Sequence, residues 1–320
     1  MICRPDASAF AVGAVLDRAD GLMREIPGAS SDDPEGLHRA RVASRRLELA
    51  LRLLGVRAGL PDDAGLLKSI RSVARALGAV RDLDVQTMWL GNFAGACSPR
   101  EKPGVRRLAL RLSQRREKLQ GGAAKTLSGF SRCGAFRDAL QSLRGAKCDM
   151  EIQGAGRRAD DGWHIARAMI MRIDLIVRLA SSLGVPEAHE AHHKLRIETK
   201  RLRYAMEIAS GLFGDVMAPH IATARRIQDL LGDLHDAHVW VESVPGLSAR
   251  ELRRTTRYFG TTRPFTRLEP GYAAVARDRL AFRRERYEKA KIFWLDLSSA
   301  GCWAELREML LDAAREDTSG

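Results

Sequence analysis

Apolar residues recur at every third or fourth position along most of the chain, a spacing that predicts amphipathic helices rather than strands. Alanine, leucine, arginine and glutamate are frequent and runs of β-branched residues are scarce, which also favours helices. We therefore expect an all-α protein of about ten helices packed on one another. The predicted helices are 10–23, 37–54, 66–90, 105–119, 136–143, 163–183, 189–212, 221–241, 273–294 and 303–311.

Glycine and proline clusters predict where these helices end. The stretch 145–162 has the composition of a linker, because several glycines stand there among charged residues. We therefore predict a first helical half at 1–148, a linker at 149–162 and a second half at 163–316. The other predicted breaks are Pro27-Gly28, 61–63, 95–104, Gly121-Gly122, Pro245-Gly246 and 260–271.

Two blocks of sequence occur twice in the same order. Residues 37–51, LHRARVASRRLELAL, align without a gap with residues 192–206, HHKLRIETKRLRYAM. A second block, LGAVRDLDV from position 77, aligns with LGDLHDAHV from position 231 and places Asp82 on Asp236. Such a repeat is the mark of a duplicated structural unit. We interpret the protein as a tandem duplication of a helical unit.

The first block of each copy predicts a helix with an apolar face and a basic face. At about 100° per residue, the histidine and the next cations share one side, opposite a row of leucines. A face that is merely solvated usually mixes acidic with basic residues, because like charges four positions apart destabilise a helix. We therefore favour a shared anion-binding site over a solvated face. The basic faces are His38, Arg41, Arg45 and, in the second copy, His193, Arg196, Lys200.

The helix that follows the first copy places Arg71, Arg75 and Asp82 on one face, and we predict that Arg71 and Arg75 also bind the anion. Gly78 and Gly232 occupy equivalent positions in mid-helix, where glycine is unfavourable, and this predicts close approach of another helix. Acidic residues at these positions are compatible with general acids or metal ligands. We favour for Asp82 and its equivalent Asp236 a role in orienting a neighbouring arginine or histidine.

Composition points to an anionic partner. The formal net charge is +13 and the sequence pI is about 10.1, so nucleic acid, an acidic membrane surface and phosphate-rich anions all fit. Arginine outnumbers lysine, and its planar fork grips phosphate oxygens in pairs. The five cysteines lack zinc-site spacing, and no signal segment or long apolar run is present. We expect a cytoplasmic protein without a membrane partner.

The repeated blocks resemble the CHAD domain, the conserved histidine α-helical domain. Its pattern is His-x-x-Arg-Val/Ile-x-x-Lys/Arg-Arg-Leu-Arg, then Leu-Gly-x-Leu/Val-x-Asp, each present twice, and the resemblance extends from Phe10 to Arg315. It implies two four-helix bundles with pseudo-twofold symmetry around a basic groove or pore. It also implies non-catalytic binding of inorganic polyphosphate, with no cofactor, and is compatible with association with polyphosphate granules. The implied ligand contacts are His38, Arg41, Arg45, Arg46, His193, Arg196, Lys200, Arg201 and Arg203.

Three of the differences between the two copies change the charge of the candidate site. Glu48 stands where the pattern and the second copy have arginine, at Arg203. A carboxylate opposes a polyanion, so we predict that the second half binds the anion more strongly. The other two differences are Arg81 and Asp84 of the first copy, which become His235 and His238 in the second.

Nucleic-acid binding is the main alternative, because the net charge fits it equally well. However, the basic residues do not interleave with aromatic residues that would stack on bases, and no helix-turn-helix is legible.

A zinc hydrolase is a further alternative. His189-Glu190-Ala191-His192-His193 matches the HExxH pattern. Against it, the repeat already accounts for His193, and Arg196 and Lys200 would repel a dication on the same face.

Overall fold

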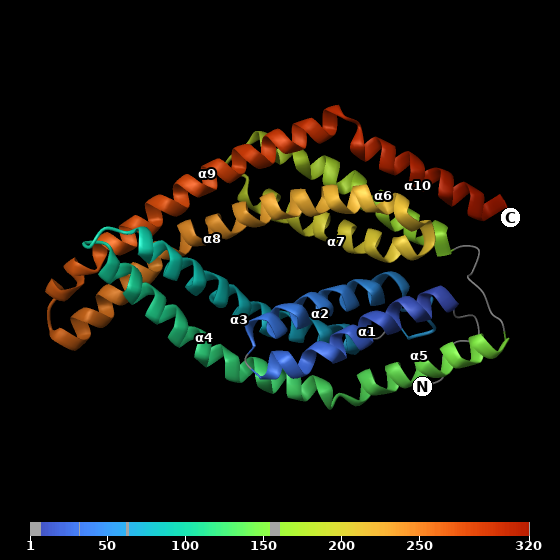
Figure 1. The fold of residues 1–320 in the computed structure, drawn as a ribbon, viewed down its shortest axis with the longest axis horizontal. Coiled ribbons are helices and arrows are strands. Elements are labelled where there is room, and N and C mark those ends of the chain that lie inside the picture. The colour runs from blue at the N-terminus through green and yellow to red at the C-terminus, as the bar shows by residue number, and fades with distance from the viewer. Residues whose placement is uncertain (1–7, 32, 62–63, 154–160, 320) are drawn as a thin grey trace.

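The computed structural model describes residues 8–31, 33–61, 64–153 and 161–319 (Figure 1). Within these ranges the chain forms ten α-helices and three short 3-10 helices, and no strand is found there. The all-α prediction is therefore confirmed. The α-helices are α1 (Ala9–Ser30), α2 (Pro34–Leu54), α3 (Ala64–Ala96), α4 (Lys102–Ser131), α5 (Gly134–Gln153), α6 (Asp161–Ala180), α7 (His189–Phe213), α8 (Ala218–Phe259), α9 (Glu269–Ser299) and α10 (Cys302–Ser319); the 3-10 helices are η1 (Ser181–Gly184), η2 (Gly214–Met217) and η3 (Arg263–Arg267).

Three predicted helix breaks are wrong. Pro27-Gly28, Gly121-Gly122 and Pro245-Gly246 all lie inside helices, in α1, α4 and α8. In α8 and α4 buried residues stand on both sides of the unfavourable pair, so tertiary packing outweighs local helix propensity. These helices are correspondingly longer than predicted.

Two of the other predicted breaks are confirmed, at 95–104 and 260–271. Helix α3 ends at Ala96 and α4 begins at Lys102. Helix α8 ends at Phe259, and the next residue, Gly260, has a φ of 71°, a left-handed conformation that glycine adopts without strain. The break predicted at 61–63 falls partly outside the described residues, as does most of the predicted linker 149–162. Residues 149–153 are the last turns of α5, and residues 161–162 already belong to α6.

The helices form two consecutive sets that pack in the same order. In the first set, α1 packs on α2, α2 on α3 and α3 on α4, while α5 returns to α1. In the second set, α6 packs on α7, α7 on α8 and α8 on α9, while α10 returns to α6. Each set thus contains five α-helices in the described part of the chain, and the pseudo-twofold relation of two four-helix bundles stays a prediction.

The two sets meet along α2 with α7 and α4 with α9. Figure 1 shows the first set (blue to green) beneath the second (yellow-green to red), with α2 and α7 facing each other. One apolar cluster runs through both sets and includes Leu47 and Leu202. A second cluster, with Leu108 and Val275, lies where α3, α4, α8 and α9 converge. Because α2 and α7 carry the first repeated block, its two copies are brought together.

A buried ion pair also joins the two sets. Asp161, at the start of α6, is fully buried and accepts hydrogen bonds from Arg57 Nε at 2.9 Å and Nη2 at 2.6 Å. The hydroxyl of Ser8, which caps α1, also donates to this carboxylate. The first residues of α1 and α6 and the end of α2 are thereby held together.

We expect Asp161→Ala to lower the free energy of unfolding by about 1.5–3 kcal/mol, because it removes the buried carboxylate that accepts hydrogen bonds from Arg57 and Ser8. Asp20→Ala is the control, since Asp20 also pairs with an arginine, Arg144, at 2.7 Å, but at the surface. That variant should cost less than about 1 kcal/mol. Chemical denaturation measures both, and equal losses would contradict the role assigned to Asp161.

Candidate anion-binding site

A cavity of about 460 Å³, here called the central cavity, lies between α2, α3, α7 and α8. Both copies of the repeat contribute equivalent pairs of residues to its wall. Arg41 of α2 corresponds to Arg196 of α7, and Asp82 of α3 to Asp236 of α8. The charged and imidazole side chains that line it are His38, Arg41, Arg81, Asp82, Arg196, Lys200, Asp229, Asp233, His235 and Asp236.

Local sequence explains why α2 presents its cations to this cavity. Asp33 caps the helix by accepting hydrogen bonds from the backbone N–H groups of Glu35 and Gly36, at 3.0 and 2.8 Å. Leu47 and Leu54 are buried on the apolar face, so His38 and Arg41 lie on another side. In α7, the fully buried Leu195 and Leu202 have the same effect on Arg196 and Lys200.

The two equivalent glycines act differently. A Cβ at Gly78 would lie 3.4 Å from Arg41 Nε, so the glycine leaves room for the guanidinium between α2 and α3. The close approach of another helix predicted at Gly78 is therefore wrong, because the neighbour there is a side chain, and it is wrong at Gly232 as well. A Cβ at Gly232 would have no neighbour within 4 Å, and Gly232 lines the central cavity.

The guanidinium groups of Arg41 and Arg196 are only weakly paired. Arg41 Nη2 lies 3.7 Å from Asp82 Oδ1, a loose ion pair. The Nε atoms of both arginines are buried and have no hydrogen-bond partner within the described residues. Buried donors normally have partners, so these two groups keep hydrogen-bonding capacity that the protein itself does not use.

Crowding of cations makes Lys200 easy to deprotonate. Burial lowers the pKa of Lys200 to about 7, and repulsion from Arg41, Arg196, Arg45 and Arg203 adds to this. Burial also lowers the pKa of Arg196, despite the attraction of Asp236. An anion in the cavity would relieve this repulsion, because it stabilises the charged forms.

Aspartates on α8 oppose the cations. Burial raises the pKa of Asp236 to about 6, against the attraction of Arg196. Many protein atoms surround Asp236. Its side chain is nevertheless exposed to water, because it lines the central cavity. Burial raises the pKa of Asp233 as well, although Arg286 Nη1 lies 3.3 Å from its carboxylate. The wall is therefore mixed in charge at neutral pH and becomes more positive as the pH falls.

The histidines form stacked pairs between α7 and α8. The Nδ1 atoms of His193 and His235 lie 3.2 Å apart, and the rings of His189 and His238 stack with centroids 4.0 Å apart. Burial, then Arg196, lowers the pKa of His193, and burial, Arg196 and His193 lower that of His235 to about 4. These rings are neutral at pH 7, so they contribute shape and hydrogen bonds rather than charge.

The residues of the HExxH pattern do not gather around one point. His189 and His193 each stack on a different histidine of α8, and Glu190 is exposed. Among the described residues, no group of three or more His, Cys, Asp or Glu side chains is placed to hold a metal ion. In the same part of the chain, no helix is long and apolar enough to cross a membrane.

Some predicted site residues of the first copy lie outside the central cavity. Glu48 is almost buried and forms ion pairs with Arg45 at 3.3 Å, Arg52 at 3.2 Å and Arg71 at 2.9 Å. Burial alone would raise the pKa of Glu48, but hydrogen bonds from Arg71 and Arg52 hold it below its ordinary value. Arg75 is exposed and its Nε donates to the backbone carbonyl of Arg71, at 3.4 Å. Glu48 thus organises three arginines instead of opposing a ligand in the cavity.

In the second copy, Arg203 and Arg201 are also engaged elsewhere. Arg203 is buried, donates to Gln228 at 2.9 Å and to Glu207, and lies over the ring of Tyr204. Arg201 is exposed and pairs with Glu198. Helix α2 has the pair Glu48–Arg52 where α7 has Arg203–Glu207, with the two charges exchanged.

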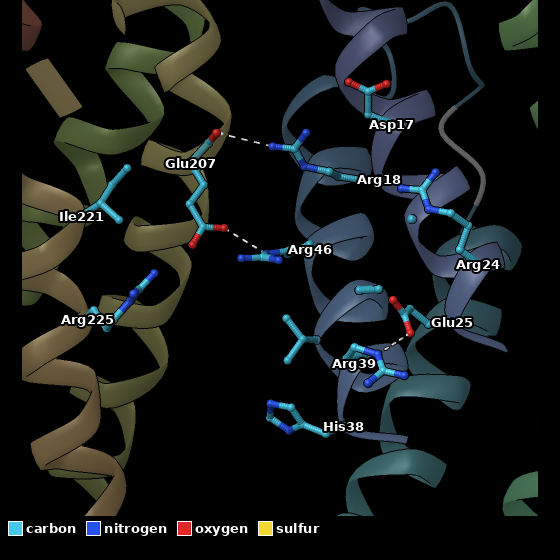
Figure 2. Close-up of a pocket in the computed structure, with 13 residues that line it drawn as sticks. Asp17, Arg18, Arg24, Glu25, His38, Arg39, Arg46, Glu207, Ile221 and Arg225 are labelled. Carbon is cyan, nitrogen blue, oxygen red and sulfur yellow. Dashed lines mark hydrogen bonds and ion pairs between the residues drawn. The ribbon is translucent and has the colours of Figure 1, made fainter. Parts of the chain in front are cut away.

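A second cavity of about 770 Å³, here called the outer cavity, lies beside the central one, and His38 lines both. Figure 2 shows arginines reaching it from α1 and α2 on one side and from α8 on the other. Arg46 lines it and bonds Glu207 at 2.9 Å, while Arg39 bonds Glu25 at 2.8 Å. Its arginines are Arg18, Arg24, Arg39, Arg46 and Arg225, and its acidic residues are Asp17, Glu25 and Glu207.

The sequence predictions therefore fall into two groups. The central cavity brings together His38, Arg41, Arg196 and Lys200 with Asp82 and Asp236, while His193 reaches it only through His235. Arg81 and His235 also line it; they were noted as a difference between the copies but not assigned to the site. The sequence signal for Arg81 and His235 is that each directly precedes a repeated aspartate, Asp82 or Asp236. Arg18, Arg24 and Arg225 have no such signal, because they lie outside both repeated blocks.

Comparisons with known proteins agree with this architecture. The chain matches the family model of the CHAD domain over residues 13–244. Among solved structures, the crystal structure of the CHAD domain from the plant Ricinus communis matches with 22% identity and a TM-score of 0.58, over 90% of this chain and 94% of that chain. At this identity the likeness shows the fold. A comparison with curated proteins found no match. Because the family model covers most of the chain, the protein belongs to the CHAD domain family.

Proposed function

We propose that the protein binds inorganic polyphosphate, without cleaving it, in the central and outer cavities that meet at His38. The observation that carries this proposal is the convergence of Arg41, Arg196 and Lys200 from both copies of the repeat on one cavity. Their repulsion is unrelieved by strong ion pairs, as the lowered pKa of Lys200 indicates. A flexible chain of phosphates supplies many oxygens that arginine and lysine bind well.

The distribution of charge favours a polymer that contacts several points over one compact anion. The cations are spread over two cavities, and carboxylates stand between them on α8 and at Glu207. A linear polyanion can pass from one group of cations to the next and avoid the acidic positions. Of Phe, Tyr and Trp, the described lining of both cavities contains only Trp240, and it is buried, so none of these rings is available to stack on a base.

We expect Arg41→Ala combined with Arg196→Ala to weaken polyphosphate binding at least tenfold, because each guanidinium offers charge-assisted hydrogen bonds worth about 1.5–3 kcal/mol. Isothermal titration at one fixed salt concentration measures this, and circular dichroism checks that the helices persist. The matched control removes the same charge at Arg132 and Arg137, which are exposed and far from the repeated blocks in sequence. An equal loss in the control would mean that net charge alone drives binding.

Arg107, which also lies outside the repeat, is unsuitable as such a control. Its Nη1 lies 3.4 Å from the buried carboxylate of Glu251, so its removal would disturb the contact between α4 and α8. Glu48→Arg is equally unsuitable as a gain-of-binding variant, because it would break three ion pairs.

Affinity for polyphosphate should rise roughly tenfold as the pH falls from 8 to 6, the effect of about one added charge-assisted contact. The pKa of Lys200 is about 7 and that of Asp236 about 6, so acidification charges the lysine and neutralises the aspartate. Both changes favour the anion. Lys200→Arg stays charged at pH 8 and should remove most of the change between pH 8 and 7. A wild-type affinity independent of pH would contradict this electrostatic description.

Polyphosphate should remain intact on incubation with the protein, with or without divalent metal. Among the described residues no cluster is placed to hold a metal ion, and His235 of the central cavity packs against the ring of His193. Phosphate release above a protein-free control would contradict a binding function. In the same assay series, competition with single- and double-stranded DNA at one salt concentration tests the nucleic-acid alternative, which wins if either DNA displaces polyphosphate.

A further inference from the structure

A third cavity, of about 390 Å³, lies between α4 and α8, and none of its residues lines the central or outer cavity. Its floor includes Leu112 and Leu247. No carboxylate lines it, in contrast to the other two cavities. The cationic side chains in its wall are Arg111, Arg115, Lys118, Arg250 and Arg254.

A buried carboxylate beneath this cavity holds part of the cluster in place. Glu251 is only 2% exposed and accepts two hydrogen bonds from Arg111, to Nε at 2.7 Å and to Nη2 at 3.0 Å. Arg107 and Arg254 approach the same carboxylate at 3.4 and 3.8 Å. Hydrogen bonding to Glu251 raises the pKa of Arg111, which keeps that arginine charged. The carboxylate therefore fixes cations at the rim and does not itself face a ligand.

The remaining cations of the wall have no counter-charge. Arg115, Lys118 and Arg250 are exposed, and within the described residues no carboxylate lies within ion-pair distance of them. Arg111 and Arg115 stand four positions apart on α4, as do Arg250 and Arg254 on α8, an arrangement of like charges that destabilises an isolated helix. Such concentrated positive charge in a concave site is stabilised by an anion.

We infer that the cavity between α4 and α8 is a second anion site that binds a short run of phosphoryl groups. Arginine forks on two facing helices suit phosphate oxygens, which accept hydrogen bonds in pairs. No aromatic residue lines the cavity, so the site does not suit the base of a nucleotide. The inference goes beyond the proposed function, which concerns the cavities lined by α2 and α7.

Titration calorimetry with tripolyphosphate tests the site, since we expect one such anion in the joined central and outer cavities, which meet at His38, and another in the cavity between α4 and α8. The wild-type chain should bind two equivalents. The triple variant Arg115→Ala, Lys118→Ala, Arg250→Ala should lose one equivalent and keep the other. The matched control Lys125→Ala, Arg132→Ala, Arg137→Ala removes as much exposed charge and should keep both.

The outcomes separate this inference from the proposed function. In one outcome the wild-type chain binds a single equivalent, which the triple variant keeps and the Arg41→Ala, Arg196→Ala variant loses. That outcome would overturn the second site alone. One equivalent lost only in the triple variant would support the second site and overturn binding in the central cavity. A loss in the control equal to that in the triple variant would also overturn the inference.

A parallel titration with long-chain polyphosphate identifies the source of the phosphoryl groups. If one polymer occupies both sites, the triple variant and the Arg41→Ala, Arg196→Ala variant should each weaken its binding. If the second site takes a separate small anion, only the central variant should do so, while the tripolyphosphate stoichiometry still shows two sites.

Discussion

The structure depends on holding two basic helix faces against each other. Helix α2 packs on α7, and this places Arg41 close enough to Lys200 and Arg196 to lower the pKa of both. Repulsion of this kind must be outweighed by other interactions. The apolar faces of the same helices supply them, because Leu47 and Leu202 belong to one core that runs through both halves. The core thus stabilises an arrangement of charges that would otherwise separate.

Some arginines form ion pairs with carboxylates and stabilise the fold, whereas others are weakly paired and remain available to bind an anion. Glu48 gathers arginines from α2 and α3, and Glu207 of α7 joins Arg46 of α2 to Arg203. Arginines held in this way contribute packing and orientation. Arg41 and Arg196 have at most one loose ion-pair partner, so the repulsion between them is little offset within the protein. A bound anion would therefore stabilise these two arginines most.

Periodicity and the internal repeat were sufficient to predict the helices and the convergence of Arg41 with Arg196, because both follow from spacing along the chain. The roles of Glu48 and Arg203 could not be predicted in this way, since they depend on neighbours from other helices. The same holds for the continuous helix through Pro245, where packing outweighs a local preference. The cavity between α4 and α8 has no repeated motif, and its cations become a cluster only when the two helices are adjacent.

The prediction that the two halves contribute unequally needs a different reason from the one that the sequence suggested. Arg203 is buried and bonded within the protein, so its exchange for Glu48 does not make the second half the stronger binder. The difference at the cavity lies instead between Arg81 of the first half and His235 of the second, whose pKa burial and Arg196 lower to about 4. The second half also depends on Lys200, which is about half ionised near pH 7. The first half therefore contributes Arg41 and Arg81 to the cavity, and the second half contributes Arg196 together with Lys200, whose charge grows with acidity.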